Sequence, residues 1–154
     1  MYLGKDKEVL ENANLALKTS DTSSIRATAL NVIGDTLFIE DPDRARNCFH
    51  EAEQLFEAEA DTYNLAHVRL SNARLLGHQN AIDVALKICH QELEKVDALS
   101  NPGIHGTANL RLAEIHTFNG APEKAQIFAK KALAIGIENN WVVLQQEASQ
   151  LISD

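Results

Sequence analysis

Two helices joined by a short turn form a unit that recurs about every 40 residues along this chain. The small residue that opens the apolar stripe of the second helix recurs at Ala45, Ala85 and Ala125. The small residue of the first helix recurs at Gly34, Ala73 and Ala113. One such unit cannot bury its own apolar face, whereas stacking of successive units buries a continuous core. The pattern therefore predicts an all-α fold of stacked antiparallel helix pairs.

The clearest unit begins near residue 107 and ends near residue 137. Gly120 supplies the left-handed backbone conformation that ends its first helix. Pro122 stands in the first turn of the next helix, where its missing N–H costs nothing. The apolar residues that follow recur every three or four positions, as one helical stripe: Ala125, Phe128, Ala129, Ala132 and Leu133.

Turn and capping signals divide the chain into a partial repeat at residues 1–21, three repeats at 22–60, 61–100 and 101–139, and a last helix at 140–154. That last helix is either a cap or a further partial repeat. Together these segments predict one domain of about eight helices. The stretch from Lys5 to Thr19 matches the second helix of a repeat, with Gly4 in the place of the turn glycine. We therefore expect a longer array to precede it; the alternative is an N-terminus that starts with a lone helix.

The repeats resemble tetratricopeptide repeats. One repeat carries the pattern in Gly34, Ala45, Phe49 and Ala52, and another carries it in Ala113, Gly120, Ala125 and Ala132. The repeat between them is weaker, because Gly77 is displaced and Glu92 stands where an alanine is usual. Asn109 and His116 replace the tryptophan and tyrosine of the family's first helix. The period of about 40 is longer than the commoner 34 and resembles the repeats of bacterial signal-transduction regulators and kinesin light chains.

The resemblance implies a right-handed α-solenoid in which the first helix of each repeat lines a concave groove. It also implies that the groove recognises another protein or peptide. The residues between the packed stripes should then line the groove. These residues are Asn31, Asp35, Phe38, His67, Leu70, Arg74, Leu110, Arg111 and Glu114.

The expected groove mixes charges of both signs with apolar side chains. Its leucines and Phe38 can anchor a peptide or partner helix, while Arg74 and Arg111 can grip carboxylates. The alternative is a solvated inner wall without a partner. The carboxylate clamp of tetratricopeptide co-chaperones is disfavoured, because Arg111 matches one member of the clamp but Asp35 places an acid in it.

Composition restricts the class of partner. The net charge of −8 argues against non-specific binding of nucleic acid, which needs clustered Lys and Arg. The sequence has no apolar run long enough for a membrane span, and residues 1–6 lack the core of a signal peptide. Two cysteines, Cys48 and Cys89, suggest a reducing compartment. We expect a cytoplasmic protein.

The sequence lacks the common short motifs of catalytic, nucleotide-binding and metal-binding sites. The sequence has no GxSxG, P-loop, GxGxxG, HExxH or CxxC. Cys48 with His50, and Cys89 with His90, are one or two residues apart and so do not share a helix face. His116 lies in an apolar stripe and is interpreted as a packed histidine. We expect neither an enzyme nor a bound metal or cofactor.

The favoured function is protein–protein recognition, as a scaffold or regulatory domain of a larger protein. A first alternative is a ligand- or peptide-sensing domain of a bacterial transcriptional regulator. A second alternative is a module that forms a homo-oligomer through its terminal helices. The apolar faces that would meet in such an oligomer are Val9, Leu10 and Ala13 at one end and Trp141, Leu144 and Leu151 at the other.

Overall fold

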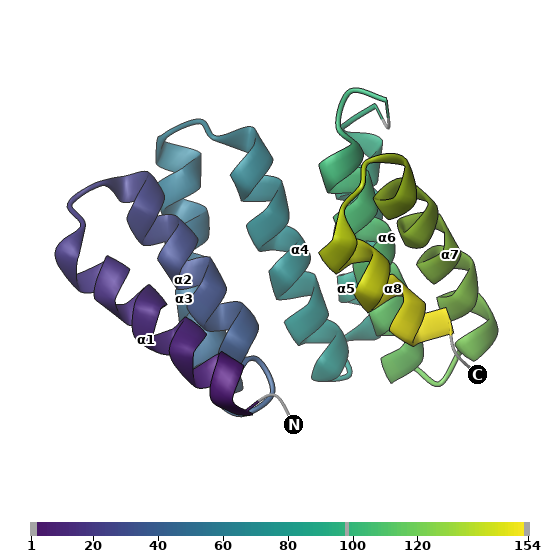
Figure 1. Ribbon diagram of the computed structural model, residues 1–154, viewed down its shortest axis with the longest axis horizontal. Helices are drawn as coiled ribbons and strands as arrows, with labels where there is room; N and C mark the ends of the chain where they lie inside the picture. Colours follow the sequence, from purple (N-terminus) through teal and green to yellow (C-terminus); the bar gives the residue numbers. More distant parts are fainter. Residues whose placement is uncertain (1–2, 98, 153–154) are drawn as a thin grey trace. The chain divides into compact units, whose positions relative to one another are not determined.

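The computed structural model describes residues 3–97 and 99–152, and these form eight helices and no strand (Figure 1). The all-α expectation is confirmed. The predicted outer limits of the first and last segments, residues 1 and 154, lie outside the described residues. The helices are α1 (Leu3–Thr19), α2 (Ser23–Leu37), α3 (Pro42–Ala58), α4 (Thr62–His78), α5 (Ile82–Glu94), α6 (Pro102–Phe118), α7 (Pro122–Glu138) and α8 (Val142–Ile152).

The chain divides into two compact units, unit 1 (Met1–Leu75) and unit 2 (Leu76–Asp154). In unit 1, α1 packs on α2 and α2 packs on α3. In unit 2, α5 packs on α6, α6 on α7 and α7 on α8, and α6 also reaches α8. Neighbouring helices thus pack consecutively within each unit, as expected for stacked helix pairs. The single domain and its right-handed superhelix stay predictions.

Four of the turns between helices share one backbone geometry, namely those after α3, α4, α6 and α7. Ala60, Asn80, Gly120 and Asn140 adopt left-handed φ angles of 54°, 66°, 65° and 56°. After each of them, an amide donates to the carbonyl five residues earlier, as from Ala121 to His116 at 2.8 Å. This bond satisfies a carbonyl that the helix end leaves unpaired. The left-handed conformation expected at Gly120 is confirmed.

Helix α1 resembles α7 in length and in the number of residues that connect it to the next helix. Both helices have 17 residues, and three residues connect each of them to the next helix. When the two helices are aligned from end to end, Ala13 matches Ala132, and both alanines are buried.

The core of unit 1 depends on a close approach between α2 and α3. The ring of Phe49 on α3 is 1% exposed and lies directly over Gly34 on α2. A Cβ atom at position 34 would lie 2.5 Å from Cε1 of Phe49. Ile33 and Phe56 are also fully buried in this cluster. Glycine at position 34 therefore sets the distance between the two helices.

Helix α6 is the central element of unit 2. It packs on α5, α7 and α8, and many of its residues are buried. Leu110 belongs to a cluster with Ala132 of α7 and Ala148 of α8, and Leu133, Leu144 and Leu151 pack against that cluster. In the part of the chain that the structure describes, no helix is long and apolar enough to cross a membrane.

We predict that Gly34→Ala lowers the free energy of unfolding of unit 1 by about 1–2 kcal/mol. The added methyl group overlaps the buried ring of Phe49, and the cost of this overlap outweighs the better helix propensity of alanine. Gly4→Ala is the control, because nothing lies within 4 Å of a Cβ atom there. Guanidinium unfolding followed by circular dichroism measures both variants, and equal stability of Gly34→Ala and the wild type would contradict this packing.

Candidate functional site

The expected groove residues are divided between the two units. Asn31 and Asp35 lie on α2, and Phe38 follows it as the C-cap. His67, Leu70 and Arg74 lie on α4 within unit 1. The remaining three, Leu110, Arg111 and Glu114, lie on α6 in unit 2. We describe the two sets separately.

In unit 1, Asp35 and Arg74 form the centre of a polar cluster. Nη2 of Arg74 donates to Oδ1 of Asp35 at 2.6 Å and to the Asp35 carbonyl at 3.4 Å. The hydroxyl of Ser71 donates to Oδ2 of Asp35 at 3.0 Å. The guanidinium carbon of Arg74 lies 4.2 Å from the centre of the Phe38 ring. We call these four residues the Asp35–Arg74 site.

The geometry of the helices explains this arrangement. Ser71 and Arg74 are three residues apart on α4, so both side chains leave the same face of that helix. Asp35 stands in the last turn of α2, and its two carboxylate oxygens reach one partner each. Only 13% of the Arg74 side chain and 29% of the Asp35 side chain are exposed. Sequence analysis placed Asp35, Phe38 and Arg74 on one surface but did not name Ser71 among the expected groove residues.

The two other expected groove residues of α2 and α4 in unit 1 are Asn31 and His67. Oδ1 of Asn31 is buried and has no hydrogen-bond partner among the described residues. The His67 ring packs edge-on against Tyr63, with 4.7 Å between the ring centres. Both residues are half-buried.

Two expected anchors are not on the surface. Leu70 is 0% exposed and Leu110 is 2% exposed. Leu110 is covered because α6 meets partners on more than one face, so its apolar surface is wider than a single stripe. These leucines are core residues, which corrects the expectation that they line an open groove.

In unit 2, Arg111 and Glu114 form an ion pair along α6. Nη1 of Arg111 donates to Oε2 of Glu114 at 2.8 Å, and Arg111 is buried. Arg74 and Arg111 were both expected to grip a partner's carboxylate, but each already contacts a carboxylate of its own chain. A ligand carboxylate would have to displace an intramolecular one at either position.

Neither cysteine is placed for reactivity. Burial raises the pKa of the Cys89 thiol to about 12, although the nearby charge of Arg111 opposes this effect. Burial also raises the pKa of Cys48. Both thiols are free and buried. No group of three or more His, Cys, Asp or Glu residues suited to a metal ion occurs within residues 3–97 and 99–152.

His116 is a packed histidine, as expected. Its ring is buried and stacks on Phe128 of α7, with 5.4 Å between centres and 7° between planes. His90 of α5 meets the same phenylalanine edge-on. Burial lowers the pKa of His116, and the charges of Lys124 and His90 lower it further.

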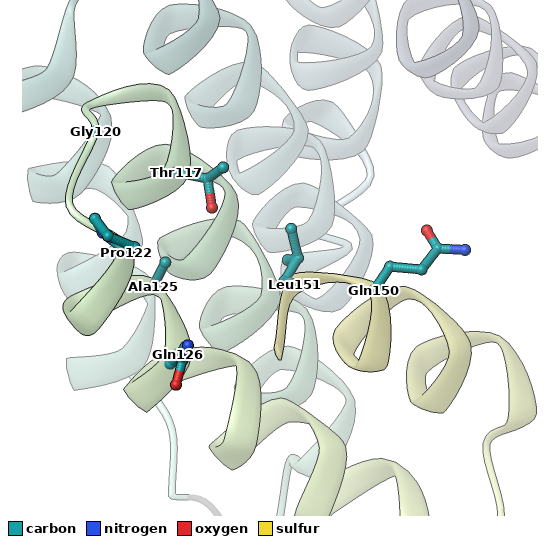
Figure 2. Close-up of a pocket in the computed structure, with 7 residues that line it drawn as sticks. All are labelled: Thr117, Gly120, Pro122, Ala125, Gln126, Gln150 and Leu151. Atoms are coloured by element: carbon teal, nitrogen blue, oxygen red, sulfur yellow. The ribbon is translucent and has the colours of Figure 1, made fainter. Parts of the chain in front are cut away.

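Two cavities were not anticipated from the sequence. In unit 1, a cavity of about 410 Å³ lies between α1 and α2. In unit 2, a cavity of about 380 Å³ is lined by residues from the end of α6, the turn after it, the start of α7 and the end of α8 (Figure 2). The second cavity is lined by Thr117, Gly120, Pro122, Ala125, Gln126, Gln150 and Leu151.

Comparison with known proteins adds no relative. No family model, no curated protein and no solved structure matches this chain. The tetratricopeptide resemblance therefore stays a prediction from the residues quoted above.

We predict that Arg74→Met destabilises unit 1 by about 1–3 kcal/mol, because it leaves the half-buried carboxylate of Asp35 without its cation. Arg46→Met is the matched control, because Arg46 makes a comparable ion pair with Asp43 at 2.9 Å on the exposed surface of α3. That pair should contribute less than about 0.5 kcal/mol. Urea unfolding of both variants measures the difference, and equal losses would mean that the Asp35–Arg74 pair is energetically an ordinary surface pair.

We predict that unit 2 loses stability as the pH falls below about 6.5, the ordinary pKa of histidine. The pKa of His116 is lower in the folded chain than in the unfolded chain, so unfolding takes up a proton in this range. The contribution of neutral His116 to stability is complete at pH values above the pKa of this histidine in the unfolded chain. It is lost as the pH falls through the lower pKa of His116 in the folded chain. Fluorescence of Trp141, the one tryptophan, reports unfolding at several pH values. His116→Gln should flatten the profile; an unchanged slope would assign the effect to other groups.

Proposed function

We propose that the chain is a tetratricopeptide-like module that binds a peptide or a helix of another protein, with the Asp35–Arg74 site as a recognition point. The observation that carries this proposal is the fixed pair of opposite charges beside the Phe38 ring. Its role would be that of a scaffold or a regulatory domain within a larger protein, in the cytoplasm. The repeat pattern of the sequence supports this role, because stacked helix repeats provide extended binding surfaces.

The charges of the site suit a polar peptide segment better than a free carboxylate. The peptide backbone alternates N–H donors with C=O acceptors. The Asp35 carboxylate can accept hydrogen bonds from the N–H groups, and the Arg74 guanidinium can donate hydrogen bonds to the C=O groups. The two charges are held in place by each other, by Ser71 and by Phe38, so little side-chain order has to be gained on binding. The pair is neutral overall and should not select a strongly charged ligand.

A second candidate function is the sensing of a small ligand, and the cavity of unit 2 favours it (Figure 2). Its volume of about 380 Å³ lies within the range of small-molecule sites. Thr117 and Gln126 would offer a hydroxyl and an amide group to such a ligand. This would suit the regulatory role considered from the sequence.

Selection from a random-peptide display library, with the whole chain as bait, tests the main proposal. We predict that selected peptides bind Asp35→Ala/Arg74→Ala at least about ten-fold more weakly than the wild type. Both partners are removed together, so no unpaired buried charge remains. Asp43→Ala/Arg46→Ala removes an exposed pair of the same unit and is the matched control.

The outcomes separate the candidates. Peptides that bind both double variants as tightly as the wild type would exclude the Asp35–Arg74 site as the recognition point. A selection that yields no peptide would exclude recognition of linear segments. If Gln126→Ala abolishes peptide binding and Asp35→Ala/Arg74→Ala does not, the peptide binds at the unit 2 cavity and not at the Asp35–Arg74 site.

A further inference from the structure

Basic groups from three helices of unit 2 surround the ring of Phe128 on α7. The ring of His116 from α6 stacks on it, with 5.4 Å between centres and 7° between planes. His90 from α5 meets it edge-on, with 6.3 Å between ring centres, and Nζ of Lys131 lies 5.2 Å from its centre. Burial lowers the pKa of His116, and the charge of Lys124 adds to this effect. We call these five residues the Phe128 cluster.

The spacing of residues on α7 explains why two lysines meet at this ring. Lys124 precedes Phe128 by four residues and Lys131 follows it by three, so all three side chains leave one face of the helix. His116 is only 6% exposed, whereas His90 and both lysines are exposed. The stack of His116 and Phe128 is thus a fixed base, and basic groups that solvent can reach stand around it.

The exposed basic groups of the cluster have no carboxylate partner among the residues that the structure describes. No ion pair within that part of the chain involves Lys124, Lys131 or His90. Glu94 stands one turn after His90 on α5, and Glu123 stands directly before Lys124 on α7. Neither of these acids forms an ion pair with the cluster. The positive charge is therefore left for an anion from outside the chain.

Cations at other helix contacts of this chain are already paired. Arg69 contacts Glu53 at 2.8 Å, and Arg74 and Arg111 each contact a carboxylate of their own unit. One exposed lysine without a partner would be ordinary, but two lysines and a histidine around one ring concentrate positive charge in a chain of net charge −8. The Debye length at physiological ionic strength is about 8 Å, so the nearby lysines outweigh distant carboxylates for an anion bound here.

The kinds of basic group indicate the chemistry of the anion. The cluster contains no arginine, whose planar fork suits the two oxygens of a carboxylate. Lysine binds phosphate as a point charge. Two ammonium groups match the charge of about −2 on a phosphate monoester, and an N–H of His90 adds a third donor for its three oxygens. A phosphate monoester therefore fits these donors better than a carboxylate does.

We propose that the Phe128 cluster binds the phosphate group of a phosphate monoester. The ammonium groups of Lys124 and Lys131 contact its oxygens, and His90 donates a hydrogen bond to it. His116 and Phe128 position these groups and do not contact the ligand. No residue of the cluster lines the cavity of unit 2, and the Asp35–Arg74 site belongs to the other unit. This site thus goes beyond the proposed peptide recognition.

Inorganic phosphate is the first probe, because it offers the charge and the oxygens without a further group. NMR spectroscopy of the whole chain at neutral pH and low salt follows the titration. We predict saturable binding with a Kd on the order of 1 mM. The ring signals of His90 and His116 should move, whereas those of His50, which is exposed on α3 in unit 1, should not. Acetate at the same ionic strength should bind about ten-fold more weakly.

Two double variants with the same net charge sharpen the test. Lys124→Gln/Lys131→Gln should weaken phosphate binding by about ten-fold or more, because it removes both ammonium groups. Lys5→Gln/Lys130→Gln is the matched control, because these lysines are exposed on α1 and α7 and lie outside the cluster. Thermal unfolding followed by circular dichroism establishes that both variants fold. Equal weakening in the two variants, or no saturable binding of phosphate to the wild type, would overturn the proposal.

Two further probes distinguish the sources of the phosphate group. Tighter binding of a short blocked phosphoserine peptide than of phenyl phosphate would assign the site to a phosphorylated protein segment. The reverse order would assign it to a small phosphate ester. Equal binding of the same peptide with and without its phosphate would overturn the proposal. Asp35→Ala/Arg74→Ala should bind phosphate like the wild type, so failure of one proposal does not imply failure of the other.

Discussion

Close approach of helices that pack on one another is the constraint on which each unit depends. In unit 1, Phe49 fills the space that a side chain at Gly34 would occupy. In unit 2, Leu144 does the same at Gly106. Short distances between helices allow buried alanines such as Ala132 and Ala148 to complete the packing. A stack of helix pairs can therefore be built from small residues with only five phenylalanines and one tryptophan.

The charged residues near the helix contacts are arranged in pairs. Arg74 contacts Asp35, and Arg111 contacts Glu114, each within its own unit. Because a buried charge without a partner is costly, such pairing lets polar side chains enter positions that face other helices. It also changes the kind of ligand that these arginines favour. A pair with no net charge suits neutral polar groups, whereas an unpaired arginine would suit a carboxylate or phosphate.

An apolar surface between two helices occurs in both units. In unit 2, Leu110 of α6 packs into the surface that α7 and α8 form. In unit 1, apolar residues of α1 and α2 line a cavity of about 410 Å³. The same physical property is thus buried within one unit and exposed in the other.

The sequence by itself determined the all-α class, the number of helices and the turns, because these depend on local periodicity, capping and left-handed residues such as Gly120. It also placed Asp35, Phe38 and Arg74 on one surface. The tertiary structure decided which of the expected groove residues are accessible. Leu70 and Leu110 are core residues because burial depends on neighbours far away in the chain. Pairing of Arg74 with Asp35, and the cavity between α1 and α2, likewise arise only where separate helices meet, and no local pattern records which helices will do so.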